Sequence, residues 1–589
     1  MGVIEVVSNQ EAVAVDSIHS VKPASIALNP TLEIDEVPTE NKSMDGIHAA
    51  VEDINSSPPL PRTKLETFLL MSALSLANLL VALDTTIITT ALAVISKDFQ
   101  SSIGYSWIGT AYILATAVTT PIWAKFSDIW GRKPLLLIAI GLFFVGSLLC
   151  GFAVSMLMLI LARVVQGLAG GGVSILVTIC ISDSFSMRER PLYFGIIGMT
   201  WAFASAIGPL LGGILTEKAS WKWCFFINLP CSAFSFLIVF WRLRVHNPRT
   251  SIWNGLKAVD WLGSFLIIAG TLLFLLALQL GGVDYAWSSP LIISFLVTGI
   301  LLALIFVVVE WKVARYPLMP LRTFYQPNNI AALGVAVLHS MVLTGGSFFL
   351  PLYFQGVLGA SPLMSGAYLI PLALSLSIVN VLNGFAVRKT GQYLPAMRIS
   401  TLFMALGFGL FIDLPAEYNW TKLIVYQIIA GIGIGPNFQC PLIALQASTP
   451  QADHAAGSST FNFLRNLSAS ITIVISSSIF QNEMQKKQVK LKSQLGPTVA
   501  GLLDGKNAAA NVQVINSLPP EQRFLARAEL LNAMLGLWIM YMALAVAAFA
   551  CSLFCRSVVL SEEHKMTTTG LGAEEEKRLA EKSPQQRFE

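Results

Sequence analysis

Charged residues are scarce in this chain. Asp, Glu, Lys and Arg make up 12% of the 589 residues, while hydrophobic residues make up 54%; soluble proteins have about 25% charged residues. The mean hydropathy is +0.66. No soluble core hides that much apolar surface, so the composition excludes a soluble globular protein. The apolar runs also lack the strict alternation of a membrane β-barrel. The net charge of +4 does not by itself indicate nucleic-acid binding.

Motifs for catalysis, metals and disulfides are also missing. The seven cysteines lie in or at the ends of apolar runs, without metal-ligand spacing. There is no phosphate-binding loop of the Gly-Lys-Ser/Thr type, no nucleophile elbow and no intramembrane cluster of His and Asp. We therefore expect no enzyme, no catalytic residue, no cofactor, no metal and no disulfide.

About fourteen apolar stretches of membrane-spanning length lie between Thr67 and Arg556. They group as six, two and six, so we expect an all-α polytopic membrane protein. The stretches begin near Thr67, Ser106, Pro134, Met156, Pro191, Cys224, Lys257, Ser288, Asn329, Ser361, Pro395, Lys422, Ala455 and Leu530.

The distribution of Lys and Arg predicts that both termini are cytoplasmic, because most basic residues of the short loops then fall inside. The expected organisation is a disordered cytoplasmic tail (1–62), a six-helix bundle (63–241), a linker with two further spans (242–328), a second six-helix bundle (329–558) and a cytoplasmic tail (559–589). The second bundle carries a long extracellular loop at about 482–529. The sequon at Asn419 falls in an outer loop and is a candidate glycosylation site, whereas Asn41 and Asn55 lie in the inner tail.

Charged groups inside the bilayer are costly and are therefore candidates for function. Asp84 in the first span and Arg163 in the fourth differ in depth by about 3–5 Å, so we predict that they pair across a water-filled cavity or as a static ion pair. A carboxylate near a cation can be held between its protonated and ionised forms, as proton coupling requires. Arg465 in the thirteenth span has no assignable carboxylate, and binding to backbone carbonyls or to an anionic ligand are equally open.

A short polar phrase occurs twice between the spans. In the first copy Asp128 ends a helix, Gly131 permits the turn, and Arg132 and Lys133 anchor it at the anionic inner leaflet or take part in a gate. Asp128 is also placed to face the N-terminus of a helix from the other half, where the helix dipole favours an acid. The second copy, with Arg388 at the corresponding position, indicates internal duplication.

The fifth span contains a proline among small residues: Gly208, Pro209, Gly212 and Gly213. Such a row permits close helix crossing, either between the two halves of the molecule or as ordinary packing. For the substrate cavity we predict a lining of neutral polar groups with many Phe and Met, suited to bulky amphipathic molecules. The candidates are Gln166, His339, Gln355, Asn380, Asn383, Gln427, Gln439 and Arg465.

Four of these patterns together resemble the major facilitator superfamily, in its fourteen-helix drug:proton antiporter branch (DHA2), and within it fungal toxin and multidrug efflux pumps. They are Leu83-Asp84-Thr85-Thr86, Asp128 with Gly131-Arg132-Lys133, Arg163-Val164-Val165-Gln166-Gly167, and Gly208-Pro209-Leu210-Leu211-Gly212-Gly213. Ala124 and Ala204 replace the leading glycines of two motifs. The resemblance implies two six-helix bundles with an inserted helix pair, proton coupling at Asp84 and Arg163, conformational switching at the Asp128 loop, and an antiporter motif in the fifth span.

The leading hypothesis is therefore proton-driven export of a toxin, drug or secondary metabolite from a fungal cell by a monomer in the plasma membrane. The alternatives are a siderophore carrier, a vacuolar carrier of basic amino acids, and a non-transporting nutrient sensor. The expected partners are the lipid bilayer, protons and an amphipathic small molecule.

Overall fold

The computed structural model describes residues 63–575 apart from 244, 246–247, 249, 283–284, 506–510, 564–568 and 573. The expected N-terminal tail, with Asn41 and Asn55, and most of the C-terminal tail lie outside the described residues. The described α-helices are α2 (Lys64–Asp98), α3 (Ser102–Trp130), α4 (Arg132–Gly151), α5 (Met156–Ser184), α6 (Arg190–Lys218), α7 (Trp223–Phe226), α8 (Asn228–Arg242), α9 (Ile252–Ala258), α10 (Trp261–Leu280), α11 (Pro290–Lys312), α12 (Pro327–Gly356), α13 (Pro362–Ala367), α14 (Ile370–Thr390), α15 (Leu394–Leu410), α16 (Trp420–Ile434), α17 (Cys440–Ala447), α18 (His454–Leu495), α19 (Pro497–Leu502) and α20 (Pro520–Leu553). Short 3-10 turns are η1 (Leu321–Phe324), η2 (Phe411–Asp413), η3 (Pro436–Phe438), η4 (Gln451–Asp453) and η5 (Val512–Ser517).

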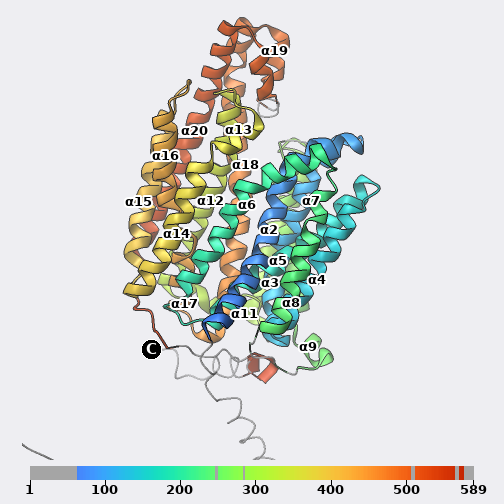
Figure 1. The fold of residues 1–589 in the computed structure, drawn as a ribbon, viewed down its shortest axis with the longest axis vertical. Coiled ribbons are helices and arrows are strands. Elements are labelled where there is room, and N and C mark those ends of the chain that lie inside the picture. The colour runs from blue at the N-terminus through green and yellow to red at the C-terminus, as the bar shows by residue number, and fades with distance from the viewer. Residues whose placement is uncertain are drawn as a thin grey trace, which may run out of the picture. The chain divides into compact units, whose positions relative to one another are not determined.

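Two helical groups follow each other along the chain. Helices α2 to α8 form the N-terminal half and α12 to α20 form the C-terminal half, on the right and left of Figure 1. We call the end where α2 begins, α3 meets α4 and α20 ends the basal face, and the opposite end the apical face. Successive long helices run alternately between the two faces, as expected for a chain that crosses a membrane repeatedly.

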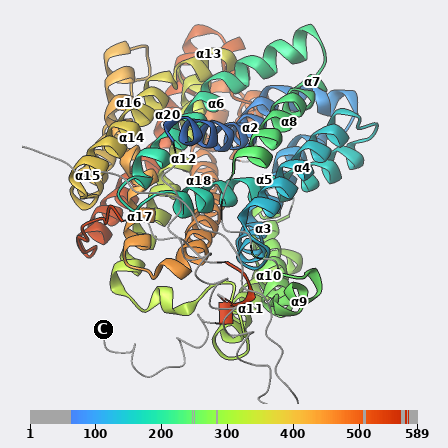
Figure 2. The ribbon, with the colours of Figure 1, turned by 60° about the horizontal axis from the view of Figure 1, so that its bottom comes forward.

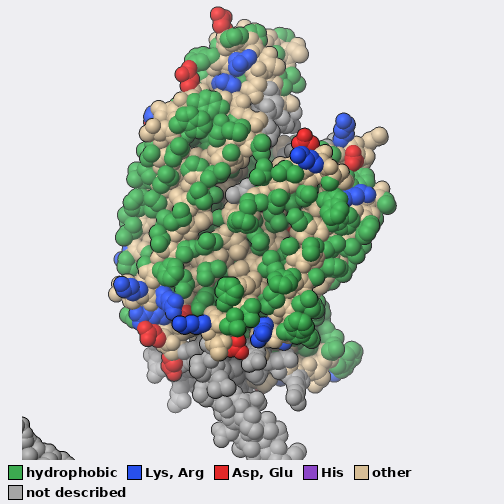
Figure 3. Space-filling model, viewed as in Figure 1, with side chains coloured by type: hydrophobic (Ala, Val, Ile, Leu, Met, Phe, Trp, Pro, Cys, Tyr) green, Lys and Arg blue, Asp and Glu red, His purple; other side chains and the backbone are tan. Residues whose placement is uncertain are grey.

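Thirteen helices within the described residues are long and apolar enough to cross a membrane. Helix α3 is 29 residues long but is not among them; it carries Thr116, Thr119 and Thr120 in addition to Lys125 and Asp128. Hydrophobic side chains cover the flanks of the helices, while Lys, Arg, Asp and Glu gather toward the two ends (Figure 3). In a membrane, this distribution leaves the apolar side chains in contact with lipid and the charged side chains in contact with water.

The inserted pair, α10 and α11, pack on each other through close backbone approach. A Cβ atom on Gly270 would lie 3.2 Å from the carbonyl oxygen of Gly299, and a Cβ atom on Gly299 would lie 3.0 Å from the carbonyl oxygen of Gly270. Helix α10 also contacts α3 and α18, and the pair lies at the margin of the two halves in Figure 2.

The segment expected as a long loop at about 482–529 is mostly helical. Helix α18 continues to Leu495, α19 follows, and α20 begins at Pro520. The buried residues Phe480, Met484, Gln488, Leu491 and Leu495 recur every three or four positions, so they form one helical face that packs into the core of the C-terminal half. The many lysines between them are compatible with helix, because only one face needs to be apolar.

The two halves are closely joined at the basal face. Arg190 donates to Oε1 of Gln446 (2.9 Å), and Gln446 donates to Ser182 (2.9 Å). Arg188 donates to the carbonyl oxygens of Arg388 (2.8 Å) and Lys389 (2.7 Å). These bonds cross from the N-terminal to the C-terminal half, so the basal face is closed in this structure.

The described part of the C-terminal tail lies on the same face. Glu574 and Lys125 form an ion pair of 2.5 Å in which both side chains are buried. The amide of Gly570 donates to the carbonyl oxygen of Asp128 (2.7 Å), and Tyr316 donates to Glu575 (2.7 Å). The tail segment therefore contacts both the first half and the linker.

Candidate functional site

Asp84 and Arg163 are in direct contact. Nη1 of Arg163 on α5 lies 2.5 Å from Oδ2 of Asp84 on α2, and neither residue exposes more than 1% of its surface. The same Arg163 nitrogen donates to Oε1 of Gln166 (2.7 Å), and Nε donates to the carbonyl oxygen of Ile108 (3.1 Å). The pairing expected from helix depth is thus present, as a buried contact rather than a contact across a water-filled cavity.

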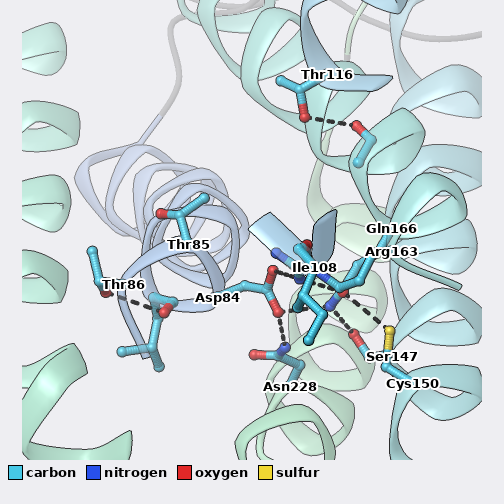
Figure 4. A network of polar contacts seen from close by, with 12 residues as sticks. Asp84, Thr85, Thr86, Ile108, Thr116, Ser147, Cys150, Arg163, Gln166 and Asn228 are labelled. Carbon is cyan, nitrogen blue, oxygen red and sulfur yellow. Dashed lines mark hydrogen bonds and ion pairs between the residues drawn. The ribbon is translucent and has the colours of Figure 1, made fainter. Parts of the chain in front are cut away.

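The second carboxylate oxygen of Asp84 accepts two amide hydrogen bonds. Gln166 donates at 2.7 Å and Asn228 of α8 donates at 3.0 Å. Gln166 also donates to Ser147 of α4 (2.9 Å), so residues of four helices form the network around this carboxylate (Figure 4). Neither Asn228 nor Ser147 was predicted for this site; the signal that could have found Asn228 is its amide near the start of an apolar span.

Tyr112 of α3 covers the other side of Arg163. Its ring centre lies 4.4 Å from the guanidinium carbon, within the range of a cation–π contact. Gly170 makes room for it, since a Cβ atom there would lie 2.4 Å from the Tyr112 hydroxyl. Tyr112 therefore packs against α5, with Arg163 beneath its ring.

The loop residues form a second buried network at the basal face. Arg132 donates to Oδ1 of Asp128 (2.6 Å), to Oδ2 of Asp183 (2.8 Å) and to Ser127 (2.8 Å). Arg132 is only 1% exposed, so it does not anchor the loop at the lipid surface; two carboxylates compensate its charge instead. Lys133 is partly exposed and lies over the ring of Phe240, while Gly131 has a φ of 93°, which favours glycine.

Asp128 also faces the C-terminal half. It lines a small cavity together with Asp453 and Ala456, at the first turn of α18. The expectation that this acid lies near a helix N-terminus of the other half is consistent with that placement.

The small residues of α6 pack within one half. A Cβ atom on Gly208 would lie 2.1 Å from Oγ1 of Thr86, and one on Gly212 would lie 2.2 Å from the carbonyl oxygen of Ile87. Both neighbours belong to α2, whereas Gly213 has nothing within 4 Å. Pro209 lies inside α6. These glycines therefore fit α6 against α2 and do not form the crossing between the halves.

The crossing between the halves uses the basal part of α6. A Cβ atom on Gly195 would lie 3.3 Å from the carbonyl oxygen of Asn380 on α14, and one on Gly384 would lie 2.7 Å from that of Pro191. The sequence did not single out Gly195 and Gly384 for this role, because glycines in membrane helices are common and only the register between two helices distinguishes them.

A cavity of about 430 Å³ lies between the two halves. Residues of α2, α3, α5 and α6 line it on one side, and residues of α12, η3, α17 and α18 line it on the other. None of its described lining residues belongs to α10 or α11. Its polar lining consists of Asn78, Thr85, Tyr112, Thr116, Thr120, Ser174, Thr178, Ser340, Thr344, Gln439, Asn462, Arg465, Asn466 and Ser470. Trp201, Phe194, Phe438 and Phe461 add aromatic surface.

Two of the eight predicted cavity residues, Gln439 and Arg465, line this cavity. The other six are placed elsewhere. Gln166 belongs to the Asp84 network, Gln355 donates to Ser365 (3.0 Å), and Gln427 donates to the carbonyl oxygen of Leu423 in its own helix (2.8 Å). Asn380 accepts from Gln439 (2.7 Å), Asn383 donates to Cys440 (3.3 Å), and Nε2 of His339 lies 3.1 Å from the carbonyl oxygen of Ile434.

Asn419 is exposed at the apical face, where its side chain caps α16 by accepting from the amide of Lys422 (3.2 Å). Its position at the end of the loop between α15 and α16 leaves the sequon at the surface.

Comparison with known proteins places the chain in a family. Residues 74–473 match the Major Facilitator Superfamily. The chain is 47% identical over 506 residues to efflux pump dotC of Dothistroma septosporum, covering 86% of this chain and 87% of that protein. It is 36% identical over 462 residues to the acurin A biosynthesis cluster MFS-type transporter of Aspergillus aculeatus, covering 78% of this chain and 82% of that protein.

A solved structure supports the same fold. The bacterial homologue of the human lysosomal transporter Spinster, in an inward-facing and unoccupied conformation, aligns with a TM-score of 0.51 at 16% sequence identity, covering 84% of this chain and 98% of that one. Fold, family match and full-length relatives agree: this chain belongs to the Major Facilitator Superfamily, whose members are multi-pass membrane transporters of small molecules.

Proposed function

We propose that this protein is a proton-driven efflux pump that exports an amphipathic toxin, drug or secondary metabolite by alternating access. The observation that carries the proposal is the position of Tyr112, which lines the cavity and lies over Arg163 of the buried ion pair. A substrate that displaces Tyr112 changes the surroundings of Arg163, and through it the charge balance at Asp84. That contact supplies a physical link between substrate binding and a protonatable carboxylate.

In the proposed cycle, Asp84 binds a proton when Arg163 turns away from it and releases the proton when the pair re-forms. Gln166 and Asn228 stabilise the ionised carboxylate, because both donate hydrogen bonds to it. The Asp128, Arg132 and Asp183 network holds the α3–α4 turn while the halves separate or rejoin at the basal face.

We further propose that α3 is the fourteenth membrane span and that the basal face is cytoplasmic. The family relationship and an even number of crossings support this orientation, in which both termini are inside and Asn419 is outside and available for glycosylation. The closed basal face then corresponds to a conformation whose cytoplasmic entrance is sealed. The names of two relatives, an efflux pump and a transporter of a biosynthesis cluster, support export. We propose that this export crosses the plasma membrane of a fungal cell.

The test is transport by the full-length protein in liposomes under an imposed pH gradient, with a lipophilic fluorescent probe and a panel of fungal metabolites. We expect gradient-dependent movement for wild type and its loss for Asp84→Asn. Asp413→Asn is the matched control, because Asp413 is an exposed acid that pairs with Lys422 at the apical face. Equal movement by wild type and Asp84→Asn would remove Asp84 from the coupling mechanism.

A further inference from the structure

Among the residues that the structure describes, none compensates the charge of the Arg465 guanidinium group. Its carbonyl oxygen accepts hydrogen bonds from Ser340 and Ser468, both at 2.9 Å, which fix the backbone of α18. The side chain, in contrast, makes no hydrogen bond or ion pair with any residue that the structure describes. Its contacts are the rings of Phe438 and Phe461, at 5.0 and 5.6 Å from the guanidinium carbon.

The other arginines inside the helical bundle differ from Arg465 in this respect. Arg163 forms an ion pair with Asp84, and Arg132 forms ion pairs with Asp128 and Asp183. Arg190 donates hydrogen bonds to the carbonyl oxygen of Phe185 and to Gln446. A cation without a partner in the middle of a membrane span is costly, and charged residues there mark substrate or ion pathways. The position of Arg465 therefore points to a ligand.

The cavity places Arg465 where a ligand would meet it. Arg465 is partly exposed and lines the 430 Å³ space between the halves. Among the described lining residues, Arg465 is the charged one. The remaining polar groups there are amides, hydroxyls and a tyrosine, with no carboxylate among them. The cavity therefore combines a positive charge with apolar and aromatic walls.

We propose that Arg465 is the recognition site for an anionic substrate, an amphipathic molecule whose acid group is a carboxylate or an ionised phenol. The guanidinium presents two parallel N–H donors that match the two oxygens of a carboxylate. Phe438 and Phe461 hold the guanidinium by cation–π contacts and offer an apolar surface to the body of the ligand. The same geometry disfavours basic amino acids, which need an acid in the cavity.

This inference deepens the proposed export function and rests on the cavity being the transport site. The test is therefore equilibrium binding without any gradient, so that it does not depend on proton coupling. Purified full-length protein is titrated with three probes of one shape: 9-anthracenecarboxylate, its neutral carboxamide and cationic 9-(aminomethyl)anthracene. Binding is followed by the fluorescence of the anthracene ring.

We expect wild type to bind the anion at least about tenfold more tightly than the neutral or cationic probe, as one charge-assisted contact implies. Arg465→Gln removes that preference and leaves the neutral probe unchanged within about twofold. Arg465→Lys restores part of it, because the charge remains but the paired donors do not. Lys422→Gln, which removes a positive charge at the apical face, leaves all three affinities unchanged.

The proposal is overturned if wild type binds the neutral or cationic probe as well as the anion, or binds none of them. It is also overturned if Arg465→Gln weakens all three probes equally, because Arg465 would then only support packing. If Arg465→Gln does not fold, the wild-type comparison and Arg465→Lys decide the question. Failure of proton-driven transport alongside an intact anion preference would overturn the proposed coupling and leave this site standing.

Discussion

The carboxylate of Asp84 and the guanidinium of Arg163 lie 2.5 Å apart at a point where α2, α4, α5 and α8 converge. Water does not reach either group, since their exposed fractions are 0% and 1%. Each charge is therefore stabilised by the other and by the amides around them. This coupling has a measurable consequence for the folded state as well as for transport.

Breaking this pair on one side leaves a buried charge without compensation. We expect Asp84→Asn and Arg163→Gln each to lower the unfolding free energy by about 3–5 kcal/mol. The double variant should lose less than the sum of the two, because no lone charge remains. Denaturant unfolding in detergent measures the three values, and additive losses would show that the two side chains act independently.

The antiporter motif offers a matched test of helix packing. Gly212→Ala places a methyl group about 2.2 Å from the Ile87 carbonyl oxygen, so α6 must move away from α2. We expect a loss of about 1–3 kcal/mol of stability, as for other overpacked sites, and a lower yield of monodisperse protein. Gly213→Ala is the control, because its added methyl group meets nothing within 4 Å. Equal behaviour of the two variants would contradict the packing described here.

The ion pair between Lys125 and Glu574 should hold the C-terminal segment on the basal face. Both side chains are 6% exposed, so salt should weaken the contact little. We expect Glu574→Ala to increase amide hydrogen exchange at 569–575 severalfold. Glu562→Ala is the comparison, because Glu562 is exposed where it pairs with Arg188 and surface pairs contribute little. Unchanged exchange in Glu574→Ala would show that other contacts hold the segment.

Glycosylation at Asn419 tests the orientation of the chain. If the apical face is extracellular, expression in a fungal host should yield a protein whose electrophoretic mobility increases after endoglycosidase treatment. Asn419→Gln should remove that change. A mobility shift that persists in the variant would place the glycan on another asparagine, and no shift in wild type would withdraw the support of this sequon for the topology.

The positions of the helices could be predicted from the amino-acid sequence. Long apolar runs must satisfy their backbone groups internally in a bilayer, so most of the described spanning helices start close to the predicted starts of the spans. Helix α20 is the exception, because it begins at Pro520 rather than near Leu530. Asp84 and Arg163 were recognisable because a charge in an apolar run is rare and expensive, and counting residues from the helix ends brought them to one depth. Gln439 and Arg465 were predicted correctly as cavity residues, because polar side chains within apolar spans were taken as candidates for the cavity lining.

Which side of each helix faces which neighbour could not be predicted and is known from the folded structure. Lipid-facing and buried faces are both apolar here, so periodicity does not fix the rotation of a helix about its axis. This is why Gln166 belongs to the ion-pair network rather than the cavity, why Gly208 and Gly212 contact α2 rather than the other half, and why small polar residues such as Thr85 and Asn462 line the cavity without having been predicted. The groups around Arg465 likewise depend on every helix packed against it. Its lack of a partner among the described residues could therefore not be established from its own span.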